Sequence, residues 1–221
     1  MMRRLIPVFI LIVPFAIIMV MISNKMDEGS TAGKYNEEGV KFYQERQWDK
    51  AIESFSKALE EDPKYAEAAS NLAMSYDARG EVEKALEYHK KAVDLRPEYS
   101  QGFANLGYSY FNSGKFKEAE EALIKAIKLN PESDQAYNNL GLAVQMQGDY
   151  QNALKYLEKA VELSPKTAAY YYHIAQNYDL KGDYTNAAYY YEKAYNLEPS
   201  NRNFSLALNI AQQKVSMRSR R

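Results

Sequence analysis

Residues 100–133 read SQGFANLGYSYFNSGKFKEAEEALIKAIKLNPES. Gly114 separates two segments that carry apolar residues at helical spacing, and a glycine there can take the positive φ that ends a helix. The small residues Gly107 and Ala119 would let two antiparallel helices approach closely. Pro131 follows the second segment, where it would start the next unit. The stretch therefore predicts a helical hairpin.

The pattern of this hairpin recurs at a fixed period along the chain. When the sequence is cut every 34 residues from Ala32 onward, positions 20 and 27 of each block are alanine, position 32 is proline, and position 8 is glycine or alanine. Position 15 is glycine in four blocks and Arg46 in the first. The sequence therefore predicts five repeats, which cover residues 32–65, 66–99, 100–133, 134–167 and 168–201.

These blocks resemble the tetratricopeptide repeat (TPR) family, whose 34-residue unit pairs a large residue, Leu-Gly and Tyr in one helix with Ala, an aromatic residue and Pro later. The third block matches nearly throughout. Departures include His89 and Leu123 at the aromatic position and Val144 in place of Tyr. The resemblance implies an all-α solenoid, a right-handed superhelix of hairpins whose first helices line a concave groove for peptides or other proteins.

The segments on either side of the repeats have other expected roles. Residues 202–216 predict an amphipathic helix that caps the solenoid, and residues 217–221 form a basic tail at its end. The cap is expected mainly to solvate the last repeat, and a phosphate-bearing lipid or an acidic partner is the alternative for the tail. Residues 23–31 are expected to be a polar linker.

Residues 5–22 are an uninterrupted apolar run of eighteen residues that follows a basic flank at residues 1–4. As a helix the run would be about 27 Å long, close to the bilayer's hydrocarbon thickness of roughly 30 Å. A buried core helix is a poor alternative because the run has no amphipathic stripe. A cleaved signal peptide stays open, although no small-residue cleavage site follows closely. We therefore expect a transmembrane signal anchor.

The orientation of this anchor follows from the charges beside it. Arg3 and Arg4 precede the apolar run, whereas Lys25 and Lys34 follow it at a greater distance. The positive-inside rule thus favours a cytoplasmic N-terminus and an exported body. We expect a single-pass protein of the plasma (inner) membrane with its repeats on the exported side, and the opposite topology stays open.

Composition argues against several other classes of protein. A net charge of −1 and a pI near 6.2 give no basic field for nucleic acid. The chain has no cysteine and only two histidines, which excludes a thiolate metal site or a cysteine nucleophile. It also lacks a phosphate-binding loop, a nucleophile elbow and an H-E-x-x-H motif. We therefore expect no enzyme, no cofactor, no metal and no small-molecule substrate.

The resemblance also indicates which side chains face the groove: block positions 2, 5, 6, 9, 12 and 13. None of these positions holds Lys or Arg. Their only charged residues are the acids Glu37, Glu67, Asp77 and Asp179. TPR co-chaperones of the carboxylate-clamp type bind a C-terminal carboxylate through groove cations. Because the groove positions here hold no cation, that recognition mode is excluded. The candidate peptide-binding residues are Asn36, Tyr43, Asn71, Met74, Asn105, Tyr108, Asn112, Asn138, Asn139, Leu142, Tyr172, His173 and Gln176.

Position 6 is the most regular of these positions. Its side chains, hereafter the position-6 row, are Glu37, Asn71, Asn105, Asn139 and His173. A row of amides can read a peptide backbone because each amide both donates and accepts. The alternative is that these amides bond within their own hairpin, and His173 is expected to be a polar wall residue rather than a metal ligand or a base.

Together these features predict a membrane-anchored TPR scaffold. Its groove would bind neutral to basic, partly apolar segments of protein partners, and it would help to assemble a membrane or cell-envelope complex. Two alternatives keep the same fold: a cytosol-facing targeting receptor on an organelle membrane, and a soluble secreted TPR module after signal cleavage.

Overall fold

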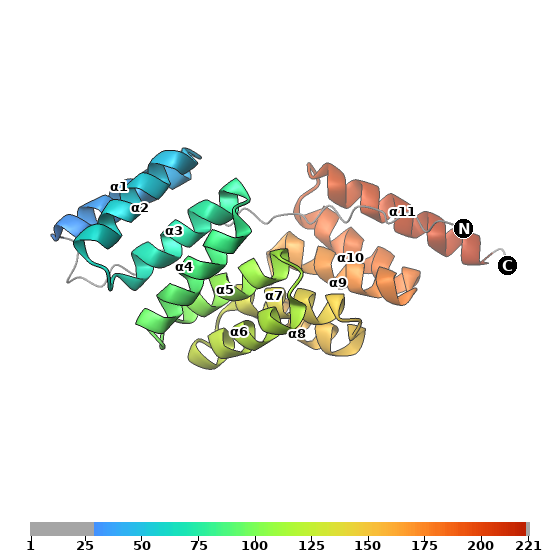
Figure 1. Cartoon of the computed structure of the whole chain (residues 1–221). Coiled ribbons are helices and arrows are strands. Elements are labelled where there is room, and N and C mark those ends of the chain that lie inside the picture. Colours follow the sequence, from blue (N-terminus) through green and yellow to red (C-terminus); the bar gives the residue numbers. More distant parts are fainter. Residues whose placement is uncertain (1–28, 220–221) are drawn as a thin grey trace, which may run out of the picture.

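The computed structural model describes residues 29–219, which form eleven α-helices and no strand (Figure 1). The helices are α1 (Thr31–Gln44), α2 (Trp48–Glu61), α3 (Ala66–Arg79), α4 (Val82–Leu95), α5 (Ser100–Asn112), α6 (Phe116–Leu129), α7 (Asp134–Met146), α8 (Tyr150–Leu163), α9 (Ala168–Lys181), α10 (Tyr184–Leu197) and α11 (Arg202–Ser219). Each predicted block holds one pair of helices, so the all-α hairpin architecture is confirmed.

The hairpins stack in chain order into an arch (Figure 1). Each helix packs against the helices before and after it, and α1, α3, α5, α7 and α9 also contact one another in succession. No pair of even-numbered helices among residues 29–219 makes comparable contact. The odd-numbered helices therefore line the inner, more tightly curved side of the stack.

The turn inside each hairpin depends on a left-handed residue. Gly80, Gly114, Gly148 and Gly182 have φ between 75° and 88°, and Arg46 takes the same region with φ 59° in the first hairpin. Glycine adopts this conformation without a steric penalty, whereas arginine does not. The prediction from position 15 is thus confirmed in four hairpins, and the first reaches the same geometry at a cost.

Close helix contact within a hairpin depends on position 8. A Cβ atom added to Gly107 would lie 2.5 Å from Cγ of Leu123, and one added to Gly141 would lie 2.6 Å from Cγ of Leu157. Both leucines are fully buried. The glycines therefore let the leucines of the second helix press against the backbone of the first.

The last helix closes the stack and is longer than predicted. α11 runs to Ser219, three residues past the predicted end of the cap, and it buries Phe204 and Ala211 against α9 and α10. The Arg218 guanidinium donates to the carbonyl of Gly182 at 2.9 Å, which fixes the added turn to the last hairpin.

The expected membrane anchor at residues 5–22 lies outside the described residues. Between residues 29 and 219, no helix combines the length and the hydropathy of a transmembrane span.

Candidate binding groove

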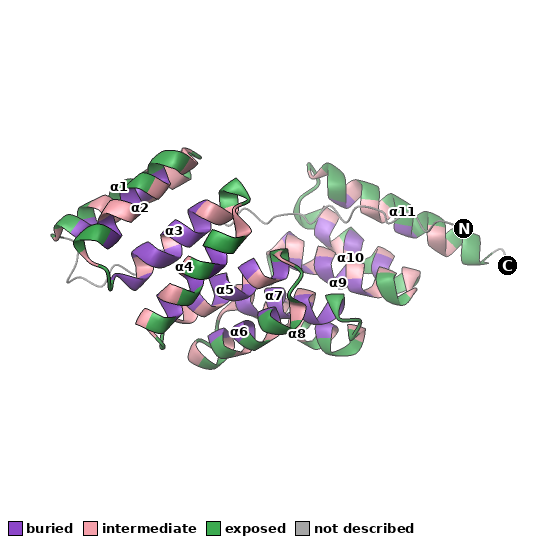
Figure 2. Ribbon diagram, viewed as in Figure 1, coloured by how far each residue is buried: buried purple, intermediate pink, exposed green. Residues whose placement is uncertain are grey.

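The predicted groove residues lie on the odd-numbered helices, along the inner side of the arch, but they differ in exposure. Asn36, Tyr43, Asn71, Tyr108, Leu142, Tyr172 and Gln176 are half-buried, and Asn112 is exposed. Met74, Asn105, Asn138, Asn139 and His173 are buried. Figure 2 shows the same gradient, with buried residues concentrated on α3, α5 and α7. A ligand in the groove would meet the first set directly and the second set hardly at all.

Most of the position-6 row is engaged between repeats. The Nδ2 atom of Asn71 donates to Oδ1 of Asn36 at 3.0 Å, and Nδ2 of Asn105 donates to Oγ of Ser70 at 3.0 Å. Each bond joins position 6 of one block to position 5 of the block before it. These amides therefore link neighbouring hairpins, and Asn105 in addition accepts from Nε2 of Gln101 within its own helix at 2.9 Å.

His173 makes the same connection at the end of the row. Its Nδ1 lies 2.7 Å from Oδ1 of Asn138, and because a carboxamide oxygen only accepts, Nδ1 carries the proton. Burial lowers the pKa of His173 from its ordinary value to about 4. The imidazole is therefore neutral at physiological pH and acts as a donor.

Asn139 is the exception in the row. The register places Ala104 at the position-5 site opposite it, and alanine offers no side-chain acceptor. The Nδ2 atom of Asn139 is accordingly buried without a hydrogen-bond partner in the described chain, while its Oδ1 accepts from Asn138 at 3.3 Å. One amide of the row is thus left without its inter-repeat bond.

Two of the four acidic groove residues have their negative charge balanced by basic residues that the list of groove positions did not include. Glu67 forms an ion pair with Arg96, and Asp179 accepts from Nζ of Lys214 at 2.6 Å. Lys214 belongs to α11. The sequence would have indicated that α11 contributes to the groove only if the residues after 201 had been aligned as the first helix of a further repeat.

Asp77 is also engaged within the protein. Its carboxylate accepts from Oγ of Ser109 at 3.1 Å and lies 3.1 Å from Nε2 of His89, a buried side chain of α4. Glu37, by contrast, is exposed at the start of the groove. The groove is therefore less acidic than its sequence positions indicate.

Two of the three aromatic candidate residues, Tyr43 and Tyr172, sit at the two ends of the array, and the third, Tyr108, lies on α5 between them. Tyr43 packs against Trp48 at a ring distance of 5.0 Å, and burial, together with the nearby Asp77 carboxylate, raises the pKa of Tyr43 to about 12. At the other end, Tyr172 packs against Tyr191 at 5.3 Å and against Phe204 of α11 at 5.2 Å. α11 thus covers part of the groove in the fifth block, and Tyr43 and Tyr108 form the more open part.

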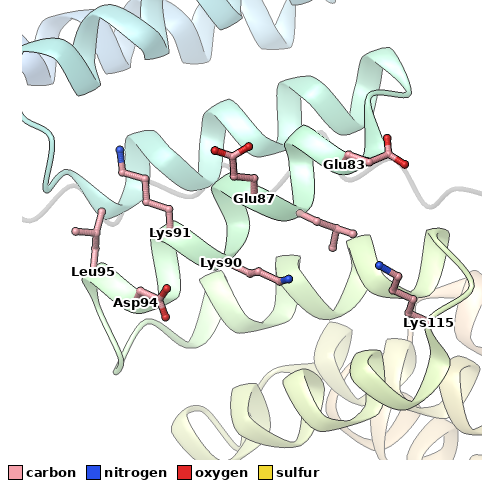
Figure 3. A pocket seen from close by; sticks show the side chains of 8 residues that line it. Glu83, Glu87, Lys90, Lys91, Asp94, Leu95 and Lys115 are labelled. Atoms are coloured by element: carbon pink, nitrogen blue, oxygen red, sulfur yellow. The ribbon is translucent and has the colours of Figure 1, made fainter.

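A separate shallow depression of about 560 Å³ lies on α4, outside the groove (Figure 3). Its lining mixes acids and lysines from α4 with Lys115, which comes from the turn before α6. It contains none of the predicted site residues. No group of three or more His, Asp or Glu side chains within residues 29–219 could hold a metal ion.

Comparison with known proteins places this geometry in a family. The model of the cilia and flagella-associated protein 70 C-terminal domain, a TPR domain, matches residues 25–219. The chain belongs to this TPR family. TPR arrays are scaffolds for protein–protein interaction, and the array of this protein is of that type.

Solved TPR structures agree with this assignment. The chain is 30% identical to MamA, with a TM-score of 0.64, and the match covers 73% of this chain and 95% of that one. A thermophilic TPR protein of Thermus thermophilus is 25% identical, with a TM-score of 0.69 and coverage of 82% and 99%. PilF of Pseudomonas aeruginosa, 24% identical, shares the fold with a TM-score of 0.74 and coverage of 85% and 86%. No curated protein matches the sequence of this chain significantly.

Proposed function

We propose that this TPR protein is a membrane-anchored, non-enzymatic scaffold that holds a segment of a partner protein in its groove and helps to assemble a membrane or cell-envelope complex. The observation that carries the proposal is the row of half-buried aromatic, amide and apolar side chains along α1, α3, α5 and α7. The hairpins behind this row are held by buried contacts. Binding therefore orders the ligand and costs little ordering of the scaffold.

The direct ligand contacts are assigned to the half-buried residues of the open part of the groove. Tyr43, Tyr108 and Leu142 offer apolar surface, and Gln176 offers an amide farther along the groove. Peptide contact by Asn71, Asn105 or His173 would require breaking a bond between repeats. These three residues are therefore assigned to shaping the groove, and the contact role belongs to the other accessible side chains.

The ligand is proposed to be neutral to basic and partly apolar. The groove positions carry no cation of their own, but Lys214 and Arg96 compensate two of the groove acids. The remaining groove acids are Glu37 on α1 and Asp77 on α3, so the negative charge lies in the first two repeats. A ligand with apolar residues and one basic end placed near α1 fits this distribution better than a strongly basic ligand.

A peptide array tests the groove. The full chain in neutral detergent should select neutral to basic segments, and Tyr108→Ala should weaken their binding about tenfold, as expected for truncating an aromatic side chain at an interface. Tyr189→Ala is the matched control, because Tyr189 is 51% exposed on α10, away from the groove. Selection of acidic peptides, or equal binding by the two variants, would contradict the proposal.

The membrane anchor and the exported location are further parts of the proposal, supported by the apolar run at residues 5–22 and the two arginines before it. Protease treatment of sealed inside-out and right-side-out membrane vesicles separates the exported orientation from that of a cytosol-facing receptor. N-terminal sequencing of the mature protein tests the remaining alternative, a secreted module released by cleavage.

A further inference from the structure

The helix α11 is apolar on two opposite sides. On the inner side, Phe204 and Ala211 are buried against the fifth hairpin. On the outer side, Leu206, Ile210 and Met217 are 59%, 44% and 65% exposed. The spacing of these three residues, four and then seven, keeps them on one face of a helix. A helix that only solvated the end of the solenoid would carry polar residues there instead.

The outer face of α11 carries a large share of the exposed apolar side chains of the described residues. The described chain has seven exposed large apolar side chains, and three of them form this stripe. The others are Met146, Leu180, Tyr189 and Leu197, which lie elsewhere, on α7, α9 and α10. Within residues 29–219 nothing covers the stripe, because α11 is the last helix of the stack (Figure 2).

The charged residues of α11 itself are of one sign. The sequence from Arg202 to Arg221 contains no acidic residue. Arg202 is exposed and lies four residues before Leu206, on the same face, whereas the Arg218 guanidinium is turned toward the carbonyl of Gly182. Two further arginines, at positions 220 and 221, follow in the sequence. Lys214 is turned toward Asp179 in the groove and is not part of this surface.

The distribution of charge decides between possible occupants of the stripe. Two copies of α11 packed face to face would bring arginines toward arginines when parallel, and an interface between two surfaces of like charge is opposed in either direction. An anionic bilayer, with its charged headgroups outside and its acyl chains below, is complementary to a stripe of aliphatic side chains that has an arginine on the same face.

We propose that α11 is an interfacial membrane-binding helix for anionic lipid. Leu206, Ile210 and Met217 enter the boundary between headgroups and acyl chains, and Arg202 contacts lipid phosphates. The two ends of the arch, α1 and α11, lie on the same side of the molecule, above α6 and α8 in the view of Figure 1. A second contact through α11 would fix the orientation of the groove relative to the membrane. This goes beyond the proposed anchor, which involves only residues 5–22.

A single fluorescent label tests the proposal in the full chain. Because the protein has no cysteine, Ile210→Cys can carry one environment-sensitive nitrobenzoxadiazole group. With vesicles of phosphatidylcholine and phosphatidylglycerol, its emission should shift to the blue and rise several-fold, and high salt should reverse the change. With phosphatidylcholine alone the label should stay in water. A label at Tyr189→Cys, which is similarly exposed on α10, should not respond in either case.

A charge-reversed variant completes the test. Arg202→Glu combined with Arg220→Glu and Arg221→Glu changes only exposed or terminal residues and should abolish the response of the Ile210 label. Equal responses with both kinds of vesicle, or no response with either, would overturn the proposal. A response without vesicles that rises with protein concentration would overturn it in favour of a second copy. The anchor does not affect the outcome, because residues 5–22 are present in both kinds of vesicle.

Discussion

Two junctions between repeats carry the same asparagine at the same position and use it differently. Between α3 and α5, Asn105 finds the hydroxyl of Ser70 and makes a buried bond. Between α5 and α7, Asn139 stands opposite Ala104, and its Nδ2 has no partner in the described chain. The residue type at position 6 therefore does not decide its role; the residue 35 positions earlier does.

The largest expected effect concerns the last member of the position-6 row. The pKa of His173 is lowered to about 4 in the folded protein, so as pH falls below 6.5 the imidazole takes up a proton in the unfolded chain but stays neutral in the folded one. The contribution of His173 to the free energy of unfolding is therefore fully present above pH 6.5. It should fall by about 3 kcal/mol as pH drops toward 4. Urea unfolding across this pH range measures it.

His173→Asn is the matched variant for this measurement, since it places at position 6 the residue that three other blocks already use. It keeps a donor for Asn138 but cannot titrate. The variant should lose the part of the pH dependence that His173 causes, and an unchanged pH profile would mean that His173 is not neutral and buried in the way described.

The next effect compares the two asparagines directly. Asn105→Ala leaves the fully buried Ser70 without this bond and should cost about 2 kcal/mol of unfolding free energy. Asn139→Ala removes a buried donor that has no partner and should cost clearly less. Because both changes truncate the same side chain, urea denaturation of the two variants isolates the inter-repeat bond. Equal losses would remove the distinction between the junctions.

A smaller effect is expected from supplying the missing acceptor. Ala104→Ser restores at position 5 the residue type that Ser70 provides one repeat earlier. The new hydroxyl should accept from Asn139 and stabilise the protein by about 1 kcal/mol. Thermal unfolding measures the gain, which should vanish when the same change is made in the Asn139→Ala variant.

The sequence was sufficient to predict the hairpins because the features that form them are local. The glycines at position 15 and the small residues at position 8 act within one block, so each could be interpreted by itself. Arg46 is the exception, because the fold imposes the left-handed conformation on a residue that does not favour it. In the other four hairpins, the residues of a single 34-residue block are enough to predict the turn.

The groove was harder to predict because its chemistry depends on pairs of residues from different blocks. Nothing within the fourth block shows that Asn139 lacks an acceptor, and nothing within the fifth shows that Lys214 will neutralise Asp179. Likewise, the apolar residues of α11 are divided between a buried and an exposed side, a division that only packing against α10 reveals. Sequence periodicity locates the groove, and contacts between repeats decide which of its side chains are available.

The central claim is that the position-6 row holds neighbouring repeats together, and a double-mutant cycle on Ser70 and Asn105 tests it most directly. Unfolding free energies of Ser70→Ala, Asn105→Ala and the double variant should give a coupling energy of about 1 kcal/mol, because either single change already removes the bond. A coupling energy of zero would contradict the account and would return Asn105 to the set of side chains available for a ligand.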